Sequence, residues 1–98
     1  MLIRIVRMTF QENRVADFLE IFNNSKQKIR HFEGCQHLEL LQDTHQSNVL
    51  MTYSYWESEA HLNIYRESAL FKTTWAATKA LFADKPVAFS SERVEEVF

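Results

Sequence analysis

The sequence predicts an α+β domain in which four strands and two helices follow the order β-α-β-β-α-β and the sheet is antiparallel. Three observations predict it. Residues 2–10 are rich in branched side chains, hydrophobic residues follow helical spacing after Asn13 and again after Ser58, and the only Gly and the only Pro fall between these segments. No repeat, low-complexity segment or linker interrupts the 98 residues, so residues 1–98 are expected to form one domain.

The first half of the chain predicts a strand followed by a helix. Residues 2–10 are the strand, and Asn13 or a neighbour opens the helix. Helical spacing places five hydrophobic side chains on the face of that helix expected to be buried: Val15, Phe18, Leu19, Phe22 and Ile29. Gly34 ends the segment, and we expect it to adopt a positive φ.

The middle of the chain predicts a hairpin and the start of a second helix. Residues 35–42 and 48–56 are strands, joined by the polar loop 43–47. Ser58 is a suitable N-cap, and the negative charge of Glu59 suits the first turn of a helix.

The second helix is expected to pause near Ser68 and to continue to about Ala83. Pro86 prevents further helix, and residues 87–98 are predicted to form the last strand. This order describes a ferredoxin-like split unit.

Composition excludes several classes of protein. The chain is 46% hydrophobic and 24% charged, which is typical of a globular domain, and its net charge of -2 provides no basic surface for nucleic acid or anionic membrane. No hydrophobic run approaches the length of a membrane span. The single cysteine, Cys35, excludes an internal disulfide and favours a reducing compartment, so we expect a cytoplasmic protein.

Both faces of the predicted sheet are hydrophobic, although two helices can cover only one of them. The first strand carries Ile3 and Ile5 on one side and Leu2, Val6, Met8 and Phe10 on the other. The third strand likewise carries Val49, Met51, Tyr53 and Tyr55 opposite Leu50 and Trp56. A monomer rarely exposes a hydrophobic surface of that extent, so we expect a homodimer in which the sheet faces of two chains cover each other.

Several short segments together resemble one family. They are Ile-Val-Arg-Met-Thr-Phe at 5–10, the turn at 33–35, and Tyr-Trp-Glu-Ser-Glu-Ala at 55–60, followed by Ser68 and Phe71. Over essentially its whole length the chain is similar to the antibiotic biosynthesis monooxygenase (ABM) domain family, whose members form dimeric α+β barrels.

The resemblance implies a range of activities. Some members oxygenate aromatic polyketides or quinols with molecular oxygen and without a metal or flavin, others degrade haem, and many have no demonstrated reaction. We therefore expect a cofactor-independent monooxygenase that acts on a small quinol or other aromatic compound. The alternative is a dimeric binding or stress-related protein that keeps the fold without the reaction.

The matching positions disfavour haem degradation. Haem-degrading members use an Asn, a Trp and a His where this chain has Val6, Tyr65 and Trp75. In polyketide-oxygenating members a Trp works with an Asn four residues earlier. Trp56 matches that Trp, whereas Thr52 replaces the Asn. Many quinol-oxidising members have a His at the position of Tyr65.

The candidate pocket consists of Trp56, Tyr65, His37, Thr52 and Trp75. Trp56 at the strand-helix junction could stack on a flat substrate while Tyr65 donates a hydrogen bond, and His37 could act as a base near neutral pH. Both aromatic residues could instead belong to the core. Trp75 shares a helical face with Phe71, Thr78 and Phe82, which favours a core role.

Other polar residues provide weaker alternatives. Cys35, His37 and Glu39 alternate along one strand and would share one side of it, but three such residues rarely converge on one ion, so no metal site is expected. Cys35 as a nucleophile has no supporting signal, and packing is favoured. Arg7, Arg66 and Arg93 could hold an acidic group of a substrate, although a solvated or dimer contact is the default for Arg93.

Overall fold

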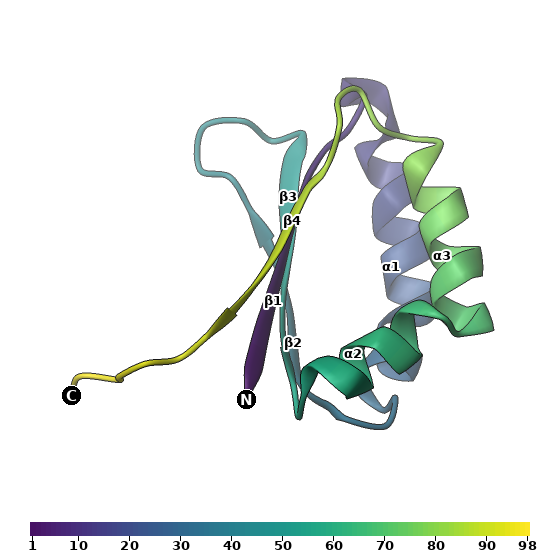
Figure 1. The fold of residues 1–98 in the computed structure, drawn as a ribbon. Helices are drawn as coiled ribbons and strands as arrows, with labels where there is room; N and C mark the ends of the chain where they lie inside the picture. Colours follow the sequence, from purple (N-terminus) through teal and green to yellow (C-terminus); the bar gives the residue numbers. More distant parts are fainter.

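The computed structural model describes all residues from 1 to 98 and has two layers, a four-stranded sheet and a layer of helices (Figure 1). The elements are β1 (Leu2–Thr9), a short 3₁₀ turn (Glu12–Arg14), α1 (Val15–Arg30), β2 (Cys35–Gln42), β3 (Val49–Trp56), α2 (Glu59–Arg66), α3 (Ala69–Lys79) and β4 (Val87–Glu92). The strand order is β2-β3-β1-β4, and every neighbouring pair is antiparallel. The predicted α+β fold is therefore confirmed.

The second predicted helix is two helices, α2 and α3, and each begins at a serine. The Ser58 hydroxyl accepts from the His61 backbone N–H, and the Ser68 hydroxyl accepts from that of Phe71. Helix α3 ends at Lys79, before the expected Ala83, because the Ala83 backbone N–H donates to the carbonyl of Thr9 instead of continuing the helix. The break at Ser68 lets α3 run along α1 while α2 crosses below (Figure 1).

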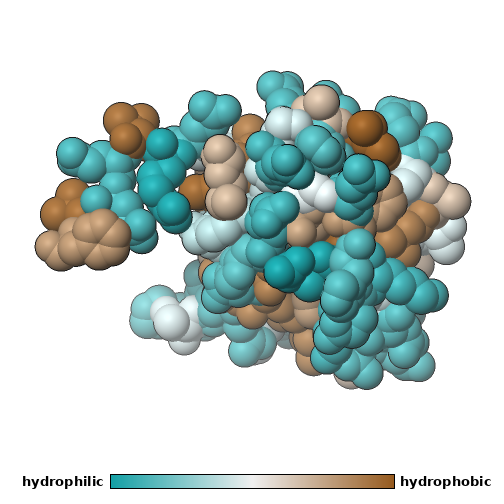
Figure 2. Space-filling view, turned by 90° about the horizontal axis from the view of Figure 1, so that it is seen from below, coloured by the Kyte–Doolittle hydropathy of each residue, from teal (hydrophilic) through white to brown (hydrophobic).

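The last strand is shorter than the expected 87–98. Glu92 pairs with Leu2, the first residue of β1, so the chain beyond Glu92 has no strand to pair with. Residues 93–98 leave the sheet as an extended tail (Figure 1), which projects from the body of the molecule in Figure 2. Its hydrophobic side chains Val94, Val97 and Phe98 are exposed.

Gly34 meets two constraints at the turn into β2. Its φ is +92°, which confirms the predicted positive value. A Cβ at this position would lie 2.5 Å from the Cβ of His61. A side chain is therefore excluded both by the backbone conformation and by the close approach of α2.

A register shift at the start of β2 changes which way its side chains face. Cys35 is paired with Trp56, whereas His37 is paired with Tyr55, and the irregularity lies between them. Cys35 thus packs towards the helices with Leu2, Trp56 and Leu62. His37 lies on the other face, in contact with Tyr53 and Tyr55. The expectation that Cys35, His37 and Glu39 share one side is wrong, because strict alternation does not hold across a bulge.

Two hydrophobic clusters hold the layers together. One consists of Met8, Phe10, Phe18, Leu50 and Leu81, and the other of Leu2, Cys35, Trp56 and Leu62. Leu19, expected in the core, is 43% exposed, and Ile21 packs against the first cluster instead. None of the helices combines the length and hydrophobic character needed to cross a bilayer.

Candidate active site

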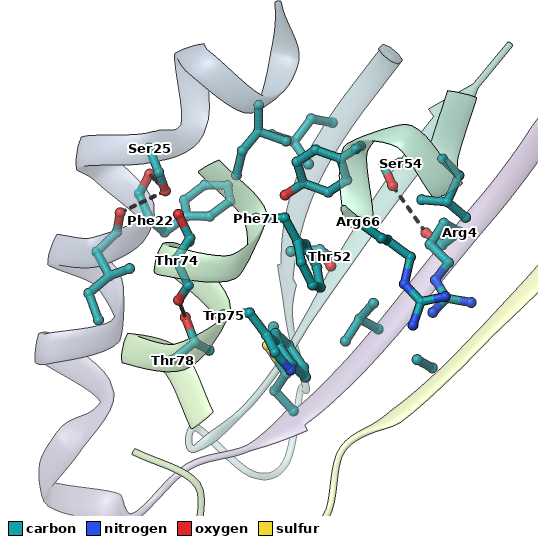
Figure 3. A pocket seen from close by; sticks show the side chains of 18 of the residues that line it. Arg4, Phe22, Ser25, Thr52, Ser54, Arg66, Phe71, Thr74, Trp75 and Thr78 are labelled. Carbon is teal, nitrogen blue, oxygen red and sulfur yellow. Dashed lines mark hydrogen bonds between the residues drawn. The ribbon is translucent and has the colours of Figure 1, made fainter. Parts of the chain in front are cut away.

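A cavity of about 210 Å³ lies between the sheet and the three helices. The side chains that line it come from all four strands and from α1, α2 and α3, and 13 of the 20 lining residues are hydrophobic. Figure 3 shows most of them. A cavity of about 150 Å³ is enough to bind benzene. This one therefore has room for a small molecule with a single ring.

One wall of the cavity is a continuous series of aromatic rings. Tyr65 stacks on Trp56 with a centroid distance of 4.8 Å, Phe71 meets the edge of Tyr65 at 5.2 Å, and Trp75 stacks on Phe71 at 5.8 Å. Trp56 is 1% exposed, and its Nε1–H donates to the Ser54 hydroxyl at 3.0 Å. Trp56 is therefore both a core residue and part of the wall, and its polar atom is already satisfied within the protein.

The Tyr65 hydroxyl is the main uncharged donor of this wall. It makes no hydrogen bond within the protein. Every fully enclosed side-chain oxygen and nitrogen has a hydrogen-bond partner, so this unpaired hydroxyl is not fully enclosed and borders open space. Burial, with a smaller contribution from nearby Cys35, raises the pKa of Tyr65 well above its usual range. Tyr65 is consequently a neutral phenol at physiological pH, able to donate a hydrogen bond but unsuited to act as a base.

Two guanidinium groups lie at one end of the cavity. Arg4 projects from β1 towards the helices and its Nη1 donates to the Ser90 hydroxyl at 3.1 Å, while Arg66 is the last residue of α2 (Figure 3). Burial, and then the positive charge of Arg66, lowers the pKa of Arg4. The lining includes no Asp, Glu or His, and neither arginine takes part in an ion pair. The site therefore carries uncompensated positive charge.

Four of the five candidate pocket residues line this cavity: Trp56, Tyr65, Thr52 and Trp75. His37 does not. Its Nε2 is 2.7 Å from a carboxylate oxygen of Glu39 on the opposite face of the sheet, so its expected place beside the pocket is wrong. The physical reason is the bulge between Cys35 and His37, which brings His37 to the face away from the helices.

Cys35 also lies outside the cavity lining. It is buried in the second hydrophobic cluster, and burial raises the pKa of its thiol. A thiol that stays protonated is a poor nucleophile, which agrees with the packing role favoured from the sequence.

Of the three arginines considered from the sequence, only Arg66 lines the cavity. Arg7 pairs with Met51 on the opposite sheet face, and Arg93 donates to the Tyr55 hydroxyl there at 3.4 Å. Arg4 was missed. The sequence does indicate this residue, because a charged side chain stands between Leu2 and Val6 on the face of the strand that alternation places in the core.

The chain matches one protein family in sequence and many solved structures in fold. A family model described as antibiotic biosynthesis monooxygenase matches residues 1–77. No curated protein matches the chain. Among solved structures, one described as an antibiotic biosynthesis monooxygenase has a TM-score of 0.91 at 17% identity, covering 97% of this chain and all (100%) of that one.

Two further structures show the same fold. A conserved protein from Methanosarcina mazei Go1 has a TM-score of 0.89 at 17% identity, covering 95% of this chain and 93% of its own. A protein from Mycobacterium tuberculosis has a TM-score of 0.89 at 14% identity, covering 99% of this chain and 98% of its own. At these identities the likeness concerns the fold alone.

Proposed function

The chain belongs to the antibiotic biosynthesis monooxygenase family, and on that premise we propose that it is a cofactor-independent monooxygenase acting on a small quinol or related aromatic compound in the cavity between sheet and helices. The observation that carries the proposal is the composition of the cavity. Aromatic rings form its wall, and its only ionisable groups are Arg4, Arg66 and the neutral phenol of Tyr65. This set favours an electron-rich ring that reacts as an anion.

The size of the cavity supports a one-ring substrate. About 210 Å³ exceeds the space that holds benzene but lies below the roughly 300–1,000 Å³ of pockets for drug-sized ligands. A polyketide with several fused rings or a porphyrin would require the helices to move apart.

The positive charges could replace a general base. No lining residue can accept a proton from a quinol near neutral pH, but two guanidinium groups close to a hydroxyl lower its pKa and favour release of the proton to solvent. The resulting anion can pass an electron to molecular oxygen, and the Tyr65 hydroxyl can donate a hydrogen bond to the oxygen atom that bears the charge. One oxygen atom would enter the ring and the other would leave as water, with the quinol supplying the electrons.

Oxygen uptake tests the proposal. Wild type, Tyr65→Phe and Trp56→Phe are compared on a panel of one-ring hydroquinones, with product mass measured under ¹⁸O₂. We expect uptake by wild type above the autoxidation rate, and one labelled oxygen atom per product. Uptake that never exceeds autoxidation across the panel would refute the proposed activity.

A binding role without oxygenation is the second candidate, and a specific observation favours it. Neither a histidine nor a carboxylate lines the cavity, so the cavity has no general base. The candidate base His37 lies on the other face of the sheet. In that case the protein would be a dimeric binding or stress-related protein that holds a small aromatic molecule. Tight binding of a quinol with no oxygen uptake would support this role.

The proposal includes a homodimer formed through the sheet face that the helices leave open (Figure 1). Three cross-strand rows make up this face: Ile3, Tyr55, His37 and Ser91; Ile5, Tyr53, Glu39 and Phe89; and Arg7, Met51, Leu41 and Val87. Leu41, Val87 and Phe89 are 38%, 52% and 46% exposed in the single chain. Covering such a face with a second copy would remove its hydrophobic side chains from water.

A cytoplasmic location is the last part of the proposal. The single cysteine is a free thiol with no partner for a disulfide in the chain, which suits a reducing compartment.

A further inference from the structure

Two like charges share one end of the cavity, although the partial burial of Arg4 and the repulsion between the two groups both oppose this arrangement. Arg4 is half-buried on β1, and Arg66 is the last residue of α2. In Figure 3 both side chains reach the same edge of the pocket, and the charge of Arg66 is close enough to act on Arg4. The only side-chain partner of Arg4 is the uncharged Ser90 hydroxyl.

An anion would remove this imbalance. A partly buried charge without a counter-ion is costly, and two adjacent guanidinium groups repel each other as well. Only Arg14 and Lys72 of the eleven basic side chains lie within 4 Å of a carboxylate, at 2.7 and 3.6 Å from Asp17 and Glu67, and Arg4 and Arg66 differ from the other unpaired ones in lining one cavity together. Such a partner is missing where the cavity opens between Arg4 and Arg66, so the ligand is the group that can supply the negative charge.

The geometry points to an aromatic carboxylic acid as the ligand: Arg4 and Arg66 bind its carboxylate, and its ring lies against the aromatic wall. This inference deepens the proposed function and rests on it for the choice of site, since one carboxylate offsets one of the two positive charges and the remaining charge still favours the anion of a neighbouring hydroxyl. Guanidinium groups bind carboxylates through paired, parallel hydrogen bonds, so two arginines can hold one carboxylate in a fixed orientation. The substrate class becomes a hydroquinone or phenol that carries a carboxylate on its single ring.

The opposite end of the cavity suits the uncharged part of the ligand. Two of its hydroxyl groups are already used inside helices, since Ser25 donates to the carbonyl of Ile21 at 2.8 Å and Thr78 to that of Thr74 at 2.8 Å, which leaves the uncharged Thr74 hydroxyl. That end therefore suits a ring edge rather than a second charged group. The ligand is consequently expected to carry its charge at one end only.

A carboxylate fits this site better than a phosphate. Phosphate sites usually combine basic side chains with backbone N–H groups from a glycine-rich loop or a helix N-terminus. Here Arg66 stands at the C-terminal end of α2, where the helix dipole is negative, and no glycine lines the cavity.

The test compares two probes that differ in charge but hardly in shape: 2,5-dihydroxybenzoate and its neutral amide, 2,5-dihydroxybenzamide. Binding is measured at pH 7 without oxygen, by isothermal titration calorimetry and by quenching of tryptophan fluorescence. We expect wild type to bind the benzoate at least tenfold more tightly than the amide. Arg66→Gln should weaken benzoate binding about ten- to hundredfold, the range for a lost charged hydrogen bond, and change amide binding less than about threefold.

Two further variants control for charge and folding. Arg66→Lys keeps the positive charge but loses the paired hydrogen bonds, so its affinity for the benzoate should fall between those of wild type and Arg66→Gln. Arg14→Gln removes the same charge from an exposed site outside the cavity lining and should bind both probes as wild type does. Arg66 is exposed, so its variants are expected to fold, which circular dichroism checks.

Three results would overturn the inference: equal affinity for the two probes, no effect of Arg66→Gln on benzoate binding, or no binding of either probe. Oxygen uptake separates this inference from the proposed function. Arginine-dependent binding of the benzoate without uptake would support the ligand class while refuting the oxygenase. Uptake with neutral hydroquinones and no preference for the benzoate would support the oxygenase and refute the ligand class.

Discussion

Removal of the Tyr65 hydroxyl should stabilise the protein while it impairs the reaction. In Tyr65→Phe the ring keeps its contacts with Trp56, Phe32 and Phe71, whose centroids lie 4.8, 5.3 and 5.2 Å away. Only the oxygen atom is lost, and it has no hydrogen-bond partner in the protein. A purely structural tyrosine at this position would gain nothing from its hydroxyl.

The magnitude follows from the surroundings of that oxygen. Burying an unpaired hydroxyl costs about 1–3 kcal/mol in proteins. Because this hydroxyl borders a cavity that can hold water, we expect an effect below that range, a gain of about 0–1 kcal/mol in the free energy of unfolding. A hydrogen bond to a charged substrate oxygen contributes about 1.5–3 kcal/mol, so kcat/KM should fall about ten- to hundredfold.

Urea denaturation and oxygen uptake with a hydroquinone substrate measure the two effects on the same protein sample. Tyr53→Phe is the matched control, since the Tyr53 hydroxyl lies 3.3 Å from that of Tyr55 on the opposite face of the sheet. It should lower stability slightly and leave kcat/KM unchanged. A Tyr65→Phe protein that is at least 1 kcal/mol less stable, or one with wild-type kcat/KM, would refute the reasoning.

Three further predictions concern the fold, the assembly and the pH dependence. Gly34→Ala should lower the free energy of unfolding by about 2–4 kcal/mol in urea denaturation, because it combines a left-handed backbone with overpacking against His61; a loss below 1 kcal/mol would contradict this. Phe89→Glu should convert the proposed dimer to a monomer in light scattering, whereas Ile64→Glu, at a residue 62% exposed on α2, should not; a Phe89→Glu protein that stays dimeric would count against the proposed sheet-face interface. Burial raises the pKa of the Cys35 thiol above 9.0 and that of the Tyr65 hydroxyl above 10.0, so the folded state holds both protons to higher pH than the unfolded state does. Both groups therefore contribute fully to the free energy of unfolding below about pH 9, and this contribution should be lost as the pH rises further. In thermal unfolding, Tyr65→Phe should lessen the loss above about pH 10, and a midpoint independent of pH between about 9 and 11 would disprove this.

Local chemistry was enough to predict most of the elements. Ser58 and Ser68 each cap a helix through the side chain, and Gly34 has the positive φ that its place in the sequence suggested. These features depend on neighbours within three or four residues, which the sequence contains directly. The expected limits of β2 agree with the structure for the same reason, since Gly34 and the polar loop after Gln42 enclose it.

Features that depend on distant partners could not be predicted. The end of β4 is set by the length of β1, because Glu92 pairs with Leu2 and no strand continues beyond that residue. The position of His37 depends on a bulge against β3, which alternation within one strand does not reveal. A one-residue shift moves a side chain from one face of the sheet to the other, so the candidate base lay on the face away from the cavity.

Arg4 best defines the site, because it is the charged residue in the otherwise hydrophobic row on the helix-facing side of β1. On the helix-facing side of β1, the positions of Leu2, Val6 and Met8 are filled by hydrophobic residues, whereas Arg4 introduces a charge there. Packing alone would favour a hydrophobic residue at this position, because a half-buried guanidinium group loses part of its hydration. We infer that a charge kept at such a cost, beside the second charge of Arg66, serves to bind an anionic ligand, whose carboxylate would offset one of the two. We therefore propose that the cavity is a binding site for an organic anion rather than a gap in the core, whether or not the bound ring goes on to react with oxygen.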